Sequence, residues 1–225
     1  MAKTPPSGND RSRLILYVAA ASGIVALVVV VLLLVVGGGS AGGSSEEKVA
    51  SAMRKAGCTF ETVPVKMKTS NHSDVPTLTT STKGLWGTFP PAGGPHYGRW
   101  AVWGFYTEPV NPRMVVHNEE HGGMVLWWGP DTPAAVVERL NAFYSDDPVS
   151  IVGTPISGLG SKVAVTAWTG DPKRYFRSGY YGFGHIAVCP TFDDETEQAF
   201  TAFKEAFRGR SPEGVPLQQN QPGTS

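Results

Sequence analysis

The most restrictive feature of this sequence is an uncharged apolar run from Leu14 to Val36, LILYVAAASGIVALVVVVLLLVV. At a rise of about 1.5 Å per residue, a helix over this run would be roughly 35 Å long and could cross a hydrocarbon core of about 30 Å. A cleaved signal peptide has a shorter apolar region, of about 7–15 residues, although Gly39-Ser40-Ala41 does offer a small-residue cleavage site. We expect one N-terminal transmembrane helix over residues 14–36, which excludes a soluble cytoplasmic protein.

The charges around this run predict its orientation. Lys3, Arg11 and Arg13 outnumber the single Asp10 in the first thirteen residues, and basic residues stay on the cytoplasmic side of a membrane. We expect a cytoplasmic tail over residues 1–13, with the rest of the chain outside the cytoplasm of a single-pass protein of the cell membrane.

The sequence beyond the run divides into a linker, a domain and a tail. Residues 37–45 are a Gly/Ser stretch that is typical of a flexible linker. Residues 46–209 are long enough for one domain with a sizeable core, and residues 210–225 are rich in Pro, Gln and Gly, which predicts a disordered tail. The whole chain has 19 Lys and Arg against 19 Asp and Glu, so we expect no nucleic-acid partner.

The two cysteines, Cys58 and Cys189, both lie on the extracytoplasmic side of this predicted topology. An oxidising compartment favours a disulfide between them, worth roughly 4–5 kcal/mol in the chain-entropy treatment. The alternative is a pair of metal-binding thiolates, although neither cysteine has the spacing of a metal site.

Short helices and strands alternate along the domain. A helix after Ser45 is expected to end at Gly57, one capped by Asn111 to end at Gly122, and one capped by Asp193 to place three phenylalanines on one face. Thr132 is a predicted cap for a fourth. These interspersed elements predict an α+β fold, a small mixed or antiparallel sheet with packed helices. The helices are expected from 46, 111, 133 and 193, and the strands at 58–65, 100–106, 124–128, 149–152, 162–168 and 186–189.

Histidines are the only distinctive chemistry of the domain. His117 and His121 stand at helical i, i+4 spacing beside Glu120, and an imidazole pair on one helical face can bind a transition metal. His96 in a glycine-rich segment is the expected third ligand, and His185 or Glu120 completes or orients the set. The structural alternative is that these histidines are ordinary buried residues. His72 lies in a polar stretch, where we expect it to be exposed to solvent.

Two further patterns surround the histidine pair. Met114 and Met124 flank it, and thioether ligands would favour Cu(I) if Met114 shares the helical face, whereas Met124 fits a core position better. The segment also fits H-x-x-E-H, a metalloprotease pattern in which the glutamate activates water. Such a site needs another carboxylate ligand, for which Glu195 or Glu197 are candidates, but a short helix that ends in two glycines is an unusual setting for it.

Three segments carry a resemblance to a known family: AGC at Ala56–Cys58, PPAGGPHYGRWAVWGFY at Pro90–Tyr106 and VVHNEEHGGMVLWW at Val115–Trp128. Together with VAVTAW at Val163–Trp168, they resemble the bacterial domain of unknown function 3105, over about residues 45–205. The sequence departs from the family pattern at Gly93, where Ser is usual, and at Glu119, where an apolar residue is usual. The resemblance implies a single-pass, extracytoplasmic domain and supplies no function.

Three functions follow as hypotheses. The first is a membrane-anchored domain that binds copper or zinc through His96, His117, His121, His185 and Glu120. The second is a metal-dependent hydrolase with Glu120 as general base, which we consider less well supported than a non-enzymatic role. The third is an interaction module for a cell-envelope protein or a carbohydrate, since six Trp and seven Tyr could line a binding surface. The alternative for those aromatic residues is that they are the inner residues of the sheet.

Overall fold

The computed structural model describes residues 44–67 and 85–225. Within these ranges, none of the helices combines the length and the apolar character that a membrane span requires. The expected cytoplasmic tail, transmembrane helix and His72 lie outside the described residues, as does nearly all of the expected linker. Residues 45–225 form one compact unit. Ser45, expected in the linker, is already the first residue of a helix.

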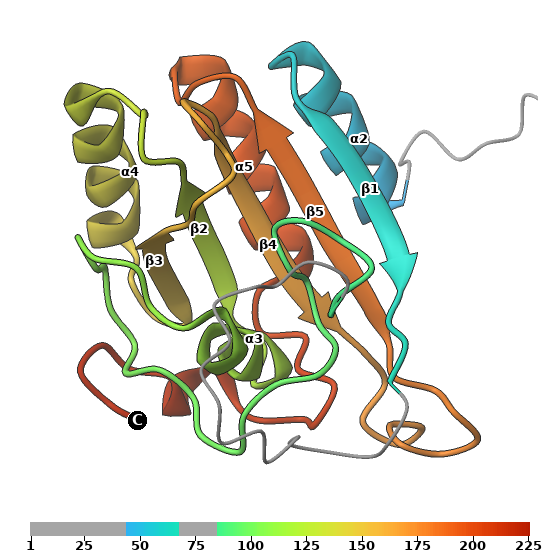
Figure 1. Ribbon diagram of the computed structural model, residues 1–225. Coiled ribbons are helices and arrows are strands. Elements are labelled where there is room, and N and C mark those ends of the chain that lie inside the picture. Colours follow the sequence, from blue (N-terminus) through green and yellow to red (C-terminus); the bar gives the residue numbers. More distant parts are fainter. Residues whose placement is uncertain (1–43, 68–84) are drawn as a thin grey trace, which may run out of the picture. The chain divides into compact units, whose positions relative to one another are not determined.

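A five-stranded mixed sheet is the centre of this unit (Figure 1), so the predicted α+β class is confirmed. The strand order is β1-β5-β4-β2-β3, with antiparallel pairing except between β2 and β3. The parallel pair needs a crossover, which α4 supplies. The strands are β1 (Thr59–Pro64), β2 (Met124–Trp128), β3 (Ile151–Pro155), β4 (Val163–Thr169) and β5 (Phe183–Cys189). The helices are α2 (Ser45–Lys55), α3 (Pro112–Glu120), α4 (Ala134–Asp146), α5 (Asp194–Phe207) and the short 3-10 helix η1 (Leu217–Gln219).

The two faces of the sheet are covered differently. One face packs against α2, α4 and α5 and forms the main hydrophobic core, whereas the other carries α3 and the irregular segments (Figure 1). Successive side chains of a strand point to opposite faces. In β4, Val165 and Ala167 therefore enter the main core, while Thr166 and Trp168 face the α3 side. This alternation decides which residues can reach the histidines.

Local capping signals place three of the helix ends in the described residues. Gly57 ends α2 with φ +70°, and the N–H of Cys58 donates to the carbonyl of Met53 at 2.9 Å. The side chain of Asn111 accepts from the N–H of Arg113, which opens α3. Asp193 opens α5 in the same way, as predicted. The prediction for Thr132 is wrong, because its hydroxyl donates to the Lys162 carbonyl instead of capping α4.

Residues 100–106 are not a strand, contrary to the prediction. Their backbone groups are satisfied one by one by three different partners. The side-chain amide of Asn118 bonds both backbone groups of Ala101, Trp103 pairs with the C-terminal tail, and Phe105 forms a single bridge to Gly153 of β3. Among the aromatic side chains of this segment, Trp103 is an inner residue, at 2 % exposed, whereas Trp100, Phe105 and Tyr106 are half-buried.

The predicted disordered tail is also wrong, because residues 210–225 pack against the domain. The N–H of Trp103 donates to the carbonyl of Thr224 at 3.0 Å, and Asn220 is 2 % exposed. The side-chain amide of Asn220 donates to the carbonyl of His121 and to the hydroxyl of Ser150. The composition of the tail predicts disorder because it offers few apolar residues to bury. The tail is instead held by hydrogen bonds to the domain, which do not require apolar residues.

Two strands begin more than one residue away from the position that the sequence predicts. β3 begins two residues later than expected, because Ser150 has φ 60° and its N–H donates to Asn220 instead of a strand partner. β5 begins three residues earlier than expected, at Phe183. The predicted disulfide between Cys58 and Cys189 is confirmed, and it ties the start of β1 to the end of β5.

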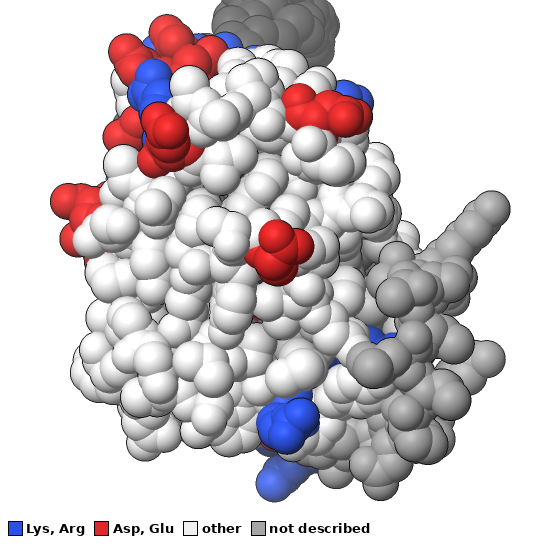
Figure 2. Space-filling view, turned by 60° about the vertical axis from the view of Figure 1, so that its left-hand side comes forward, with Lys and Arg blue, Asp and Glu red and all other residues white. Residues whose placement is uncertain are grey.

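Charged side chains are unevenly distributed on the face of the domain that Figure 2 shows. Acidic and basic groups gather mainly toward its upper end, where the two signs are mixed, and much of the middle carries no charge. This face therefore presents no broad patch of a single sign.

Candidate metal centre

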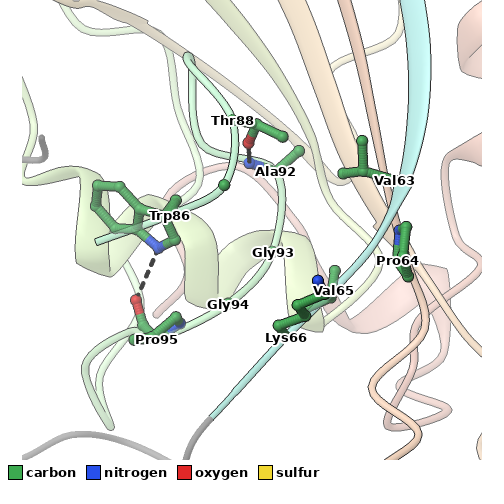
Figure 3. A pocket seen from close by; sticks show the side chains of 11 residues that line it. Val63, Pro64, Val65, Lys66, Trp86, Thr88, Ala92, Gly93, Gly94 and Pro95 are labelled. Carbon is green, nitrogen blue, oxygen red and sulfur yellow. Dashed lines mark hydrogen bonds between the residues drawn. The ribbon is translucent and has the colours of Figure 1, made fainter. Parts of the chain in front are cut away.

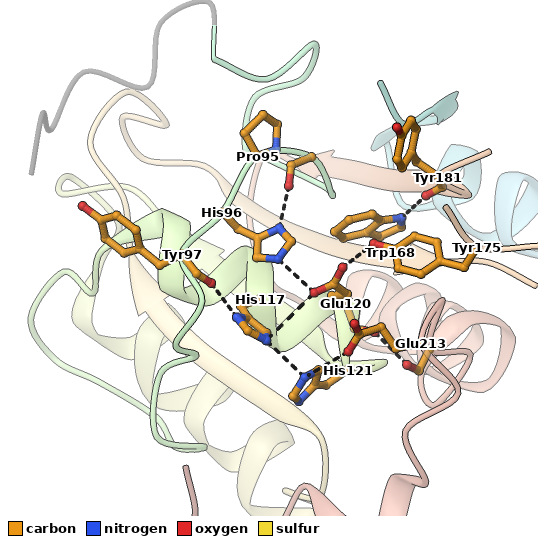
Figure 4. Close-up of polar contacts among 12 residues, drawn as sticks. Pro95, His96, Tyr97, His117, Glu120, His121, Trp168, Tyr175, Tyr181 and Glu213 are labelled. Atoms are coloured by element: carbon orange, nitrogen blue, oxygen red, sulfur yellow. Dashed lines mark hydrogen bonds and ion pairs between the residues drawn. The ribbon is translucent and has the colours of Figure 1, made fainter. Parts of the chain in front are cut away.

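α3 and one irregular loop bring the site together. α3 carries His117 and Glu120 on its inner side, and His121 caps its C-terminal end. The loop from Gly93 to Tyr97 crosses over the helix and places His96 against Glu120 (Figure 4). His96 is fully buried, and His117 and Glu120 are 2 % and 1 % exposed.

The nitrogen and oxygen atoms of these side chains point toward one another. Nε2 of His96 lies 2.9 Å from Oε2 of Glu120, and Nε2 of His117 lies 3.9 Å from the same oxygen. One donor atom from each of the three residues lies within 4.8 Å of the others. His121 stands next to this group, with its Nε2 3.1 Å from Nε2 of His117.

Backbone carbonyls fix the orientation of two of the imidazole rings. Nδ1 of His96 donates to the carbonyl of Gly94 at 2.7 Å, and Nδ1 of His117 donates to the carbonyl of Tyr97 at 2.5 Å. A neutral imidazole that donates from Nδ1 has its lone pair on Nε2. Both rings turn their Nε2 toward Glu120. A hydrogen bond from the other ring nitrogen, here Nδ1, to a protein acceptor usually orients a histidine that binds a metal.

Glu120 remains a carboxylate in this buried setting. Burial raises its pKa, but His96, the hydroxyl of Tyr175 and His117 together outweigh burial, so that the net shift is downward. Burial lowers the pKa of His117 to about 4, although its bond to Tyr97 opposes the shift. The pKa of Tyr175 is raised by burial and by the negative charge of Glu120. The site thus combines a negative oxygen with a neutral imidazole, His117, which are the protonation states that a metal requires.

Glycines allow the loop to lie close to the sheet. Gly93 has φ +81°, and a Cβ there would come within 2.7 Å of Val65 and 2.8 Å of Trp168. The ring of Trp168 also packs against His96, with 5.7 Å between the ring centres. A larger residue at position 93 would therefore push away the loop that carries His96.

The outer side of the same loop borders a pocket (Figure 3). Trp86 and Lys66 lie on its wall, and the indole N–H of Trp86 donates to the carbonyl of Pro95 at 2.9 Å. The described residues that line it come from β1, from the segment after β1 and from positions between 86 and 95, and do not include the three candidate ligands. Trp86 thus supports the loop from outside, while His96 points inward.

The profile of a family described as "Protein of unknown function (DUF3105)" matches residues 80–216, more than half of the chain and the whole of this site. The chain belongs to this family. Neither the curated proteins nor the solved structures contain a match. Membership of DUF3105 confirms the resemblance seen in the sequence, and the site geometry therefore carries the functional argument.

Glu119 is a supporting residue to which the sequence pattern assigned no role. It is fully buried, accepts a hydrogen bond from the N–H of Gly93 at 2.9 Å, and accepts another from the hydroxyl of Thr166. Burial raises its pKa to about 8, against the effect of both hydrogen bonds. Glu119 thus joins the loop, α3 and β4. Its presence where the family pattern is usually apolar was the available signal.

The C-terminal tail supplies the other contacts that the sequence did not predict. The hydroxyl of Ser211 donates to the carbonyl of Glu120 at 2.7 Å, and Oε2 of Glu213 lies 3.4 Å from Nε2 of His121. A disordered tail would not contribute to the site, so the sequence prediction did not include Ser211 or Glu213 among its residues.

His185 is not part of the cluster, contrary to its place among the predicted ligands. It lies on the opposite face of the sheet, where its two ring nitrogens contact the hydroxyls of Thr62 and Thr169 and its ring stacks on Phe207. The register pairs it with Ala167, a residue of the main core. Strand alternation therefore separates it from His96.

The remaining candidate ligands are also placed elsewhere. Met124 is a core residue as expected, and Met114 packs against the hydrophobic cluster around Trp103. Glu197 forms an ion pair with Arg139 at 2.9 Å on the surface of α5, and its neighbour Glu195 is exposed. The metalloprotease pattern therefore lacks the carboxylate ligand that those two residues were expected to supply.

Proposed function

We propose that His96, His117 and Glu120 bind a transition-metal ion and that this domain functions through it. The convergence of three donor atoms within 4.8 Å carries the proposal. In a tetrahedral site with bonds of about 2.0–2.2 Å, the donor atoms stand roughly 3.3–3.6 Å apart. The separations of 2.9 and 3.9 Å from the Glu120 oxygen bracket this spacing, so that small side-chain rotations would be enough to hold an ion.

A cation also suits the charges of the site. Two imidazole rings and the carboxylate of Glu120 converge in a buried space, where a nearby cation stabilises a negative charge. A proton shared by His96 and Glu120 would supply the same charge in a purely structural cluster. Metal binding and this structural alternative make different predictions for metal content.

The donor set favours zinc or Cu(II). Imidazole nitrogen and carboxylate oxygen suit both ions, whereas Cu(I) prefers sulfur. Met114 packs in a hydrophobic cluster, which removes the main argument for Cu(I).

We further propose that the domain works outside the cytoplasm on a single-pass anchor. Two observations support this: the apolar run of residues 14–36 and the Cys58–Cys189 disulfide, a bond typical of oxidising compartments. Copper or zinc available in the cell envelope would then be the physiological ligand.

Metal content of the purified protein tests the proposal. The full-length chain, kept in detergent and carrying an affinity tag without histidine, is loaded with zinc or copper, desalted and analysed by mass spectrometry. We expect one ion per chain. The His117→Ala variant should bind it at least about 100-fold more weakly, because a ligand is lost.

His185→Ala is the matched control, since it removes a buried imidazole from the opposite face of the sheet. It should retain the ion. A wild-type protein that holds no metal after loading, and whose stability zinc and copper leave unchanged, would refute the proposal in favour of the structural cluster.

The hydrolase hypothesis has less support from the geometry. Both oxygens of Glu120 are engaged, one by Tyr175 and the other by the imidazoles, which suits a ligand better than a general base. The interaction-module hypothesis rests on the largely uncharged middle of the face in Figure 2. No feature of that surface identifies a partner.

A further inference from the structure

Donor atoms continue outward from the buried cluster to the protein surface. From Oε2 of Glu213, the steps through His121, His117 and Glu120 to His96 measure 3.4, 3.1, 3.9 and 2.9 Å (Figure 4). Side-chain exposure falls along the same path, from 32 % at Glu213 to 12 % at His121, 3 % at His117 and 0 % at His96.

We infer that His121 and Glu213 form an outer metal-binding position through which the ion reaches and leaves the buried ligands. This inference rests on the proposed metal-binding function. It gives His121, which lies outside the group of three ligands, a distinct role, and it assigns a role to the C-terminal tail.

The chemistry of the ion explains why such a position is needed. A hydrated ion must exchange its water molecules for protein ligands, and a buried site requires an access path. With metal–ligand bonds of about 2 Å, two donors less than 4 Å apart can hold one ion together. Each step along the path satisfies this limit, so that the ion can acquire each new ligand before it loses the previous one.

The tail holds the outer position in place. Asn220 donates to the carbonyl of His121 at 2.8 Å, and Ser211, two residues before Glu213, donates to the carbonyl of Glu120. The carboxylate of Glu213 also places negative charge at the exposed end of the path, where it attracts a cation from solution.

The rates of metal uptake and release test this inference. Trp100 lies 4.6 Å from His121 and 5.2 Å from His117 between ring centres, so that bound Cu²⁺ should quench its fluorescence. Cu²⁺ is the probe because nitrogen and oxygen sites bind it at least as tightly as zinc. Uptake is followed by stopped flow with the full-length protein, and release by mixing the loaded protein with EDTA.

We expect Glu213→Gln and His121→Gln each to slow uptake and release at least about tenfold. Both rates should fall together, so that the dissociation constant changes much less than either rate. Glu108→Gln removes the same charge from another exposed position and should leave both rates within about twofold, which separates a local role from general attraction. Circular dichroism checks that each variant is folded.

Different results overturn different claims. Unchanged rates in both variants would refute the outer position alone, as would a weaker affinity with an unchanged uptake rate, which would make His121 a resident ligand. Failure of the wild-type protein to take up Cu²⁺ would refute the proposed function itself, and the outer position with it.

Discussion

At the scale of single residues, His185 is an imidazole that the fold keeps neutral. It is 4 % exposed, its two nitrogens contact two threonine hydroxyls, and Phe207 covers its ring. Burial, with a smaller contribution from the charge of Arg210, lowers its pKa to about 4. A hydroxyl can donate or accept, so that both hydrogen bonds are compatible with the uncharged ring.

This lowered pKa makes the protein sensitive to acid. Between about pH 6.5 and pH 4 the unfolded chain binds a proton at His185 and the folded chain does not, so stability falls as the pH falls through this range. From pH 7 to pH 4.5, the metal-free wild-type protein should lose roughly 2–3 kcal/mol of unfolding free energy relative to His185→Gln. Urea denaturation at the two pH values measures the difference. An equal loss in both proteins would show that His185 titrates normally.

At the scale of elements, α3 determines the geometry of the site. It contributes two of the three candidate ligands. Between them in the helix, Asn118 bonds to the segment of residues 100–106 and Glu119 to the loop that carries His96. The side chain of Asn118 takes the place of a neighbouring strand for Ala101, with two hydrogen bonds of 2.9 Å. The Asn111 cap and the glycines after His121 predicted the helix, but the sequence could not predict that Asn118 would pair with Ala101.

Replacing Asn118 therefore tests how that segment is held. Asn118→Ala leaves the buried N–H and carbonyl of Ala101 without these hydrogen bonds, and we expect a loss of about 2–4 kcal/mol of unfolding free energy. Chemical denaturation of the metal-free protein measures it. Asn141→Ala, the same change at an exposed position of α4, should cost less than about 0.5 kcal/mol. A similar small effect at Asn118 would contradict the assigned role.

At the scale of the whole domain, the C-terminal tail closes the side that α3 leaves open. It bonds Trp103, the end of α3 and the residue that precedes β3, three places that are far apart in the sequence. The domain is therefore complete only with residues that follow α5.

Truncation after Gly209 should have large effects for this reason. It removes the partners of Trp103 and of the carbonyls of Glu120 and His121, and we expect a loss of roughly 3 kcal/mol or more of unfolding free energy. Hydrogen exchange in residues 100–106 should accelerate at the same time. A truncated protein with unchanged stability and exchange would restore the view that the tail is disordered.

Features that depend only on neighbouring residues could be predicted from the sequence alone. Capping residues placed the starts of α3 and α5, apolar patterns placed β2 and β4, and i, i+4 spacing brought His117 and His121 to one end of a helix. Short motifs, each contiguous in the chain, were also enough to indicate the DUF3105 family.

Which distant residues meet depends on how the whole domain folds. The order and facing of the strands excluded His185 from the cluster, and the folded tail added Glu213 to its edge. The physical reason is that a side chain's partners depend on the face of the sheet it occupies and on the segments that cover that face. Neither is encoded within a few residues of the histidines themselves.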